Sequence, residues 1–368
     1  MIIDKTRTKE IITINGKLKL EREYWYCREC GHSEYPRDKT LKIGELPHKI
    51  TKEMQLEIAY YAQNQCSFER ASQMIERVFK VEINKETVRE ITEKIGTDVF
   101  RADTARAEAS LNHIVEIEYT KAREETLYLE IDGAAVNTRV EDENGSTWRE
   151  NKTAMVFSDK HMIKRKEEGN IITKKEYVPL IGSSEDFKKY VFDIALRAGY
   201  GKVQNVVVIS DGATWIRNMC AEIFPDAIQI LDLYHLKENI YAYAKYLYGE
   251  EKAKYTAWAE IIIDKIEKQN DIDGALSLIP RREKLPAGIV NLPAYIENNR
   301  EKMNYKIYKE RGFFVGSGAI ESANKTIVRQ RLKQAGMRWS VQGAQAMLSL
   351  RAKVESGLWN HVALVVCA

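Results

Sequence analysis

The feature that most constrains the fold is an apolar run that ends in Asp-Gly. Residues 205–212 read Asn-Val-Val-Val-Ile-Ser-Asp-Gly. Four successive apolar residues are typical of a strand that is buried on both faces of a sheet. Such a strand needs other elements packed on each side of it, so the segment favours an α/β fold.

Length and composition indicate a globular protein of two or three domains. The chain has 368 residues, of which 44% are hydrophobic and 30% charged. Its net charge is only +3, so affinity for nucleic acid must come from local patches. No apolar run approaches the roughly 20 residues of a transmembrane helix, and no signal-peptide pattern opens the sequence. The odd cysteine count predicts a cytoplasmic protein without a disulfide scaffold, because three cysteines stand alone: Cys66, Cys220 and Cys367.

Strand and helix patterns alternate around the apolar run. Residues 127–132 alternate in polarity and also end in Asp-Gly. The expected elements are strands 127–132, 136–141 and 148–157, an excursion hairpin over 159–178, helix 184–198, strand 205–211, helix 213–223, strand 228–235 and helices over 237–308. This order predicts a ribonuclease H-like mixed sheet with an all-helical insertion before the last core helix.

The N-terminal part reads as short strands with a hairpin at Asn15-Gly16. It carries Cys27-Arg-Glu-Cys30, and two thiolates at this spacing can both reach one tetrahedral zinc ion. The motif is half of a zinc ribbon, since no second cysteine pair exists and only His32 and His48 are nearby as further ligands. A redox motif is disfavoured because no helix follows directly. Zinc at Cys27 and Cys30 is therefore a prediction, while a closed four-ligand site remains open.

Two helices joined by a tight turn are expected over residues 71–79 and 84–95. Asn84 is a suitable N-cap, and the inward positions are Val88, Ile91 and Ile95. The pattern is helix-turn-helix-like, and the start of its second helix would bring Lys85 and Arg89 to a DNA major groove. An ordinary helical hairpin is the alternative.

A glycine-bracketed turn at residues 316–318 leads into the last predicted helix. Its charged residues are spaced four apart and would line one stripe: Glu321, Lys325, Arg329 and Lys333. A helix with one carboxylate followed by a row of cations could bind a nucleic-acid phosphate backbone through the cations and coordinate a metal ion through the carboxylate. A solvated, salt-bridged face is the alternative. The further basic residues expected at DNA are Arg331, Arg338, Arg351 and Lys353.

Three carboxylates would meet in this order of elements. Asp132 ends the first strand, Asp211 ends the fourth, and Glu321 lies on the last helix. Phosphodiester cleavage benefits from two divalent cations about 4 Å apart, and Mg²⁺ prefers a few carboxylate ligands. Each Asp-Gly alone is also a turn signal. Together the three residues predict a site for two Mg²⁺ or Mn²⁺ ions.

Four sequence motifs, taken together, resemble a known protein family. They are Asp132-Gly133, Asp211-Gly212-Ala213-x-Trp215, Asp232-Leu-Tyr-His235, and Gly316-Ser-Gly-x-x-Glu321 continued by Gly336-Met-Arg338-Trp339. Over roughly residues 126–359 the chain resembles bacterial insertion-sequence DDE transposases of the Kra group. The resemblance implies that Asp132, Asp211 and Glu321 form the catalytic, metal-binding triad.

The same resemblance has implications for the accessory residues and the N-terminus. It gives Asp232 and His235 a role in DNA-end handling or site organisation, with a helix-capping pair as the alternative. Family members typically carry a cysteine pair upstream of the knuckle. This chain has no cysteine before Cys27, so we expect a ribbon that is incomplete or truncated at its start.

A transposase of this kind would bind the terminal repeats of its element, cut the ends with water and join the freed 3′-hydroxyl to target DNA. A homodimer or larger assembly on DNA is implied because transposition joins two ends, and no membrane partner is expected. The alternatives are a ribonuclease H-like nuclease or resolvase that only hydrolyses DNA, and a catalytically inactive, transposase-derived DNA-binding protein.

These predictions divide the chain into five segments. They are a partial zinc-ribbon-like knuckle (1–46), a helix-turn-helix-like DNA-binding region with a linker (47–121), the first part of the catalytic core (122–236), a helical insertion (237–311), and the last core helix with a basic C-terminal region (312–368).

Overall fold

The computed structural model describes residues 1–112, 119–163 and 171–367. The chain divides into two compact units. The first comprises residues 1–105, 135–149 and 326–368, and the second comprises residues 106–134 and 150–325. Every carboxylate of the predicted catalytic triad belongs to the second unit.

The first unit begins with a long β-hairpin. Strands β1 (Ile2–Thr13) and β2 (Gly16–Tyr26) pair antiparallel around Asn15-Gly16, as predicted, and β3 (Ser33–Glu34) adds a short third strand. Gly16 has φ +101°, a left-handed conformation that glycine adopts without a steric cost. Helix α1 (Pro36–Thr40) follows the knuckle.

The longer helices of the first unit are α2 (Lys52–Asn64), α3 (Phe68–Phe79), most of α4 (Lys85–Asn112), α14 (Val341–Glu355) and α15 (Trp359–Cys367). The side chain of Asn84 accepts a hydrogen bond from the Thr87 amide at 2.7 Å, which confirms the predicted N-cap. The predicted inward positions are also confirmed, because Val88, Ile91 and Ile95 lie in the buried core of this unit.

The second unit is built on a mixed sheet, which confirms the predicted α/β class. Its five strands lie in the order β10-β9-β4-β5-β8. They are β4 (Arg123–Asn137), β5 (Trp148–Ser158), β8 (Lys175–Ile181), β9 (Val203–Ser210) and β10 (Ile228–Leu231). Strand β9 is parallel to both of its neighbours, whereas β8 is antiparallel to β5.

The bounds of three predicted strands were wrong. The strand expected over 228–235 ends at Leu231, because a helix begins at Leu233. Residues 127–132 and 136–141 are not separate strands, because β4 continues through Gly133 to Asn137. The third strand of the meander is instead β8, within the predicted excursion hairpin, of which residues 164–170 lie outside the described residues. Its Pro179 is tolerated because β8 is an edge strand. A two-stranded ribbon, β6 (Met162–Ile163) with β7 (Ile171–Ile172), precedes it.

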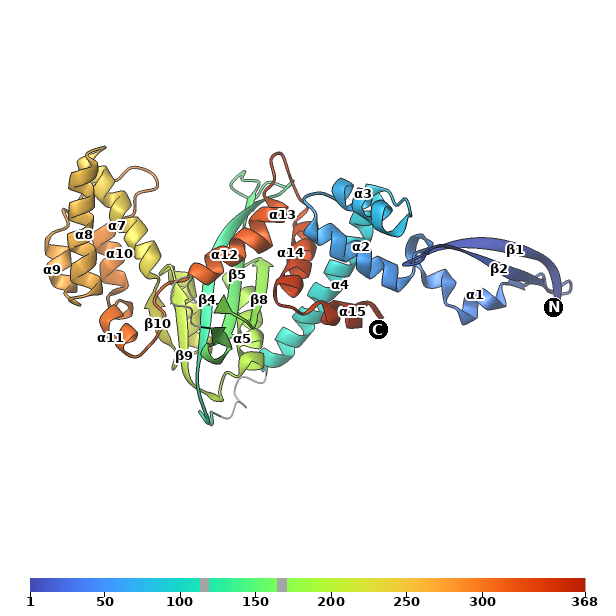
Figure 1. Ribbon diagram of the computed structural model, residues 1–368, viewed down its shortest axis with the longest axis horizontal. Coiled ribbons are helices and arrows are strands. Elements are labelled where there is room, and N and C mark those ends of the chain that lie inside the picture. The colour runs from blue at the N-terminus through green and yellow to red at the C-terminus, as the bar shows by residue number, and fades with distance from the viewer. Residues whose placement is uncertain (113–118, 164–170, 368) are drawn as a thin grey trace. The chain divides into compact units, whose positions relative to one another are not determined.

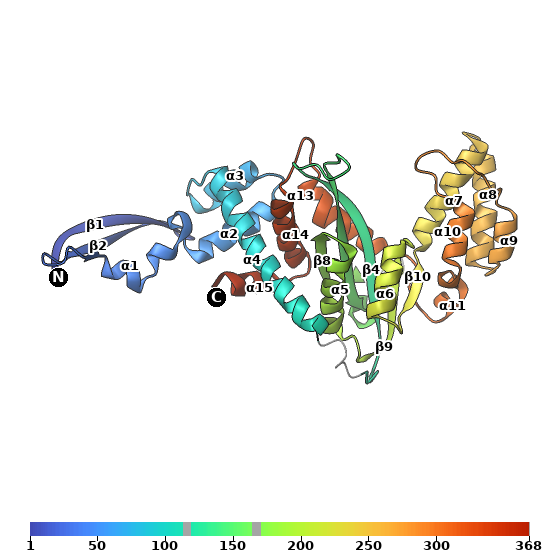
Figure 2. The ribbon, with the colours of Figure 1, turned by 180° about the vertical axis from the view of Figure 1, so that it is seen from behind.

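Helices lie on both faces of this sheet. Helices α5 (Ser184–Ala198) and α6 (Thr214–Ile223) lie in front of the sheet in Figure 2. Helix α12 (Gly318–Ala323) crosses the opposite face, in front in Figure 1. The apolar run of β9 is therefore covered from two sides, and Val207, Val208 and Ile209 are at most 1% exposed.

The segment after β10 is helical, as predicted. Its helices are α7 (Leu233–Tyr248), α8 (Lys252–Glu267), α9 (Ile272–Ser277), α10 (Leu292–Asn298) and α11 (Tyr305–Glu310). Two tyrosines attach it to the ends of the strands. Tyr295 Oη donates to the Asp211 carbonyl at 2.8 Å, and Tyr305 Oη donates to the Leu231 carbonyl at 3.0 Å.

The last core helix differs from the prediction. Helix α12 ends at Ala323, residues 324–329 form a π-helical turn, and α13 (Gln330–Leu332) follows. A π turn closes hydrogen bonds over five residues. Glu321, Lys325, Arg329 and Lys333 are all exposed, and their placement on one stripe stays a prediction.

In the described part of the chain, no helix combines the length and the apolar character that crossing a membrane requires.

We expect Gly212→Ala to destabilise the second unit. Gly212 has φ +88°, and a Cβ there would lie 2.8 Å from Leu231 Cδ1 and 2.9 Å from Asn299 Nδ2. Gly288→Ala is the matched control, because Gly288 has φ +85° but nothing within 4 Å of the added Cβ. The control should cost about 1 kcal/mol in unfolding free energy from backbone strain alone, and Gly212→Ala roughly 1–3 kcal/mol more from overpacking. Equal losses in chemical denaturation would contradict the steric argument.

Candidate active site

Three aspartates lie in one row at the carboxyl end of the parallel strands. The last paired residues are Ile131 on β4, Ser210 on β9 and Leu231 on β10, with Ser210 in register with both neighbours. The next residue of each chain segment is an aspartate: Asp132, Asp211 and Asp232. Since neighbouring strands lie about 4.8 Å apart, the register brings Asp132 and Asp211 side by side, with Asp232 next in the row.

Asp132 is half-buried and bound on both oxygens. Its Oδ1 accepts the Gly133 amide at 2.7 Å, and its Oδ2 accepts Asn324 Nδ2 at 2.6 Å. Burial raises the pKa of Asp132 above its ordinary value, although these two hydrogen bonds act in the opposite direction. The carboxylate thus connects β4 to the residue that follows α12.

Asp211 is fixed by its own loop and by α10. Its Oδ1 accepts the Ala213 amide at 2.9 Å, and its main-chain carbonyl is the acceptor for Tyr295. The side chain is half-buried. In the part of the chain that the structure describes, the second carboxylate oxygen, Oδ2, makes no hydrogen bond.

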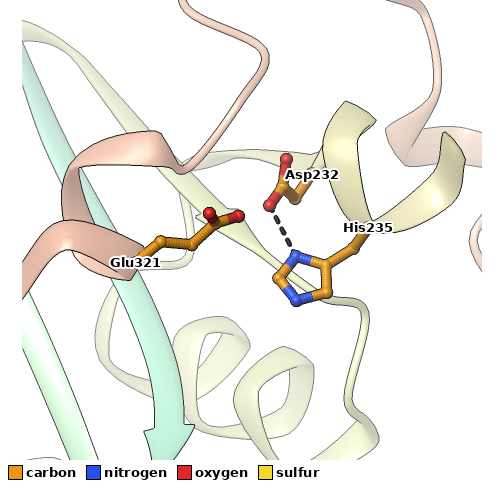
Figure 3. Close-up of side chains that lie close together, drawn as sticks. All are labelled: Asp232, His235 and Glu321. Atoms are coloured by element: carbon orange, nitrogen blue, oxygen red, sulfur yellow. Dashed lines mark hydrogen bonds and ion pairs between the residues drawn. The ribbon is translucent and has the colours of Figure 1, made fainter. Parts of the chain in front are cut away.

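Asp232 is fully buried and makes four hydrogen bonds. Its Oδ1 accepts the amides of Tyr234 (2.9 Å) and Ser317 (3.3 Å), while its Oδ2 accepts Ser317 Oγ and lies 2.7 Å from His235 Nδ1. Burial alone would raise the pKa of Asp232, but the hydrogen bonds from His235 and Ser317 outweigh it, so the net shift is downward. Figure 3 shows the bond to His235.

His235 presents its second ring nitrogen to the site. The hydrogen bond to Asp232 raises the pKa of His235 to about 9, with further contributions from Asp132 and Asp211. The ring is therefore an imidazolium at neutral pH when no metal ion is bound. It places a positive charge among the carboxylates.

Glu321 reaches this cluster from α12. Ligand atoms of Asp232, His235 and Glu321 all lie within 4.8 Å of one another, and Figure 3 shows the Glu321 carboxylate directed toward the imidazole. In the described residues Asp132 and Asp211 form no such tight group with Glu321. Burial, followed by the charge of Asp232, raises the pKa of Glu321. Since Asp232 already has four donors, it is better suited to positioning His235 than to holding an ion.

A further carboxylate, Glu130, was missed in the sequence. It is 2% exposed, on the same face of β4 as Asp132, and its Oε2 accepts the Ile320 amide at 2.8 Å. Burial raises the pKa of Glu130 to about 8. A polar residue alternating with apolar ones normally indicates solvent exposure, so the strand pattern gave no sign of burial.

These carboxylates hold one face of the segment that carries Glu321. Asp232 binds Ser317, Glu130 binds Ile320, and Asp132 binds Asn324. Residues 317, 320 and 324 are spaced three and four apart, so they share one helical face. Glu321, the residue after Ile320, lies beside Asp232 and His235.

The donors fit hard divalent cations such as Mg²⁺ or Mn²⁺. Asp132, Asp211 and Glu321 offer carboxylate oxygens at one edge of the sheet, and the raised pKa values of Asp132 and Glu321 indicate that nearby positive charge would stabilise their ionised forms. Asn324 Oδ1, beside Asp132, is buried and has no hydrogen-bond partner in the described residues. The chemistry of the donor set therefore suits the predicted metal ions.

The cysteine knuckle forms a tight turn. The amide of Gly31 donates to the Cys27 carbonyl at 3.0 Å, and Cys30 is exposed. Hydrogen bonds from Cys30 lower the pKa of the Cys27 thiol, which favours the thiolate that zinc binds. In the described residues no third candidate ligand joins the two sulfurs in a compact group. Zinc at this site stays a prediction.

The predicted DNA-contacting residues divide into those with accessible side chains and those that are buried. Those with exposed side chains are Lys85, Lys325, Arg329, Lys333 and Arg338, and Arg89 is half-exposed. Within this group Lys85 pairs with Glu69 and Arg89 with Glu93. All six remain candidates for DNA contact.

The prediction for Arg331 was wrong. Its guanidinium is 1% exposed, donates to the carbonyls of Ala62 and Cys66, and lies over the rings of Phe68 and Trp339. These interactions occupy the side chain inside the first unit. Two carbonyl oxygens and two aromatic ring faces, not a phosphate, contact this cation.

Arg351 and Lys353 were also wrongly predicted to contact phosphate. Arg351 is 3% exposed and donates to the carbonyls of Gln63 and Ile327. Lys353 is 5% exposed and pairs with Asp103 at 2.9 Å. Both side chains connect α14 to its neighbours.

The whole architecture corresponds to one family model. The model of the Uncharacterised protein family UPF0236 matches residues 1–365. This chain belongs to the UPF0236 family. The match includes the knuckle, both units and every residue of the candidate site.

Several UPF0236 proteins of Caldanaerobacter subterraneus subsp. tengcongensis are similar to this chain. One is 26% identical over 364 residues, which cover 97% of this chain and 69% of the relative. Another is 24% identical over 363 residues, with 97% and 69% covered. A third is 24% identical over 363 residues, with 97% and 66% covered. The chain thus spans about two thirds of the length of these relatives.

We expect Glu130→Gln to flatten the pH dependence of stability. Glu130 has a folded-state pKa of about 8 against an ordinary value of 4.5, so the folded chain holds an extra proton between these values and stability falls as the pH rises through this window. The substituted glutamine cannot ionise but can still accept the Ile320 amide. Between pH 5 and pH 8.5 in EDTA, the wild type should lose roughly 2–4 kcal/mol of unfolding free energy more than Glu130→Gln.

Chemical denaturation at the two pH values measures this difference. Glu250→Gln is the control, because its side chain is 88% exposed. If the unfolding free energy of the wild type changed with pH in parallel with that of Glu130→Gln, the expected raised pKa of Glu130 would be contradicted.

Proposed function

We propose that this UPF0236 protein is a DDE transposase that cleaves and joins the DNA of an insertion sequence. The observation that carries the proposal is the row of Asp132, Asp211 and Asp232 at the ends of adjacent parallel strands, with Glu321 of the last core helix beside Asp232 and His235. This arrangement gathers hard oxygen ligands at one place. It is the requirement for phosphodiester chemistry assisted by a metal pair.

The sheet supports a ribonuclease H-like core. Strands β4, β5 and β8 come first in the chain and lie together, while β9 and β10 are added on the other side of β4 in the order β10-β9-β4-β5-β8. The helical insertion follows β10, and α12 returns to the face of β4. The sequence patterns predicted the same order of strands and helices, but with 136–141 as a separate strand in place of β8 and with the strand at 228 extending to residue 235.

The residues have distinct proposed roles. Asp132, Asp211 and Glu321 would hold two Mg²⁺ or Mn²⁺ ions, which when bound activate the attacking oxygen and stabilise the leaving oxygen. Asp232 orients His235 through Nδ1 and anchors Ser317. The Nε2 of His235 is then directed to donate a hydrogen bond to a DNA phosphate at the cleaved bond. This assigns Asp232 and His235 to site organisation, although Asp232 also caps α7.

The names of the relatives support a mobile element. The name of one relative joins eleven numbered designations, and that of another joins four. We take these as separate loci for one protein in one genome, which is the pattern that a self-copying element leaves. Several insertions of the same gene would produce such a series.

DNA would bind through separate parts of the chain. The proposed phosphate contacts of the C-terminal region are Lys325, Arg329, Lys333 and Arg338, and the helical region with Lys85 and Arg89 would recognise terminal repeats. Zinc at Cys27 and Cys30 would stiffen the N-terminal knuckle. Because transposition joins two DNA ends, the active form is proposed to be a homodimer or larger assembly.

Alanine substitution of Asp132, Asp211 or Glu321 should abolish excision and joining. The substrate is a donor plasmid that carries the gene with its natural flanking DNA, mixed with a target plasmid and Mg²⁺, and sequenced junctions are the readout. Each variant should fall by more than about 100-fold, since loss even of an outer partner of a metal ligand costs 10–100-fold. The control is Asp226→Ala, an acid 67% exposed in the same unit.

The same assay separates the alternatives. Cut ends without joined products would favour a nuclease or resolvase. DNA binding with no cleavage in the wild type, unchanged in all three alanine variants, would favour a DNA-binding protein without catalysis. EDTA should stop both reactions, and activity that persists in EDTA would contradict the metal site.

A further inference from the structure

A cavity of about 530 Å³ opens directly beside the candidate active site. Asp211 and His235 form one part of its wall. The remainder comes from the first turn of α6, with Thr214 and Arg217, and from the helical insertion. The cavity therefore lies where the sheet edge that carries the carboxylates meets the insertion.

The insertion contributes neutral amide groups to this cavity. Asn239 on α7 lines it, as do Tyr295 and Asn298 on α10. Asparagine side chains offer a donor and an acceptor together, which match the edge of a nucleobase. The planar ring of Tyr295 provides a surface for stacking.

One cation lines the cavity and lacks an anionic partner. Arg217 is exposed, and it forms no ion pair with the residues that the structure describes. Its guanidinium can bind a phosphate through two parallel hydrogen bonds. The lining thus combines one phosphate-binding group with base-binding groups, in a volume within the 300–1,000 Å³ that is usual for ligand sites.

Hydrogen bonds hold this wall in place before any ligand arrives. Tyr295 Oη donates to the Asp211 carbonyl at 2.8 Å, and Asn299 Nδ2 donates to the Tyr295 carbonyl at 3.0 Å. Asn299 is 4% exposed and is itself the acceptor of a bond from Lys302 Nζ at 3.3 Å. The cavity is thereby tied to the strand end that bears Asp211.

We propose that this cavity binds one unstacked nucleotide of the DNA strand, next to the phosphodiester that the site cleaves. The proposal rests on the transposase function and adds a substrate subsite to it. A stacked duplex does not fit a cavity of this size, whereas a single nucleotide that has left the stack does. Arg217 binds its phosphate, and Asn239 and Asn298 bind the base.

Binding of the four deoxynucleoside 5′-monophosphates to the full chain in EDTA tests the cavity without catalysis. Saturation-transfer NMR should detect them, and both deoxyribose 5-phosphate and the free nucleosides should bind more weakly. Arg217→Gln and Asn298→Ala should each weaken binding about tenfold, the scale of one hydrogen bond to a charged or well-placed group. Asn218→Ala is the control, since Asn218 neighbours Arg217 on α6, is exposed and does not line the cavity.

The outcomes separate this proposal from the function on which it rests. Mononucleotides that fail to bind, or that bind equally to wild type, Arg217→Gln and Asn298→Ala with unchanged thermal unfolding, overturn the subsite. Strand joining that remains normal in both variants overturns it as well, while leaving the transposase intact. A chain that binds mononucleotides as described but never cuts the donor plasmid supports the cavity and contradicts the transposase.

Discussion

The site depends on the register of three parallel strands. Ile131, Ser210 and Leu231 are paired across β4, β9 and β10, and main-chain hydrogen bonds fix this row with little freedom. Because each strand continues into an aspartate, the spacing of the carboxylates follows from the backbone ladder. The Asp232 amide, which donates to the Ser210 carbonyl at 2.8 Å, extends the ladder into the site itself. A slip of one residue would turn each aspartate to the opposite face.

The carboxylates placed side by side by this register repel one another unless positive charge or hydrogen-bond donors compensate them. Without a metal ion the structure supplies this compensation through His235, the Ser317 hydroxyl, the Asn324 amide and main-chain N–H groups, all directed at Asp132 or Asp232. Glu130 avoids the problem because burial keeps most of it protonated at neutral pH. The proposed cations would therefore enter a site whose shape is already held by hydrogen bonds.

The sequence was a good guide where local patterns and burial agree. The apolar run of β9 predicted a strand covered on both faces, and Asn84 predicted the start of α4, since each depends on a few neighbouring residues. It misled where long-range packing reverses the local pattern. The charged residues Lys175 and Glu176 gave the start of β8 the composition of a loop. The pattern around Glu130 predicted a solvent-exposed side chain, but the residue is buried. Arg331 was predicted to contact DNA, but its guanidinium packs against aromatic rings. The π-helical turn left no pattern that distinguishes it from an α-helix.

The hydrogen bonds that seat α12 also have a consequence for synthesis. Asn324 and Ile320 are made 192 and 190 residues after their partners Asp132 and Glu130. A chain still growing on the ribosome, or one cut short within the insertion, has the row of aspartates but neither Glu321 nor the helix that orients it. Such a protein would fold a sheet without a complete site, so incomplete copies of the gene would yield products that lack the third acid. The candidate site is therefore complete only when the reading frame is uninterrupted through α12.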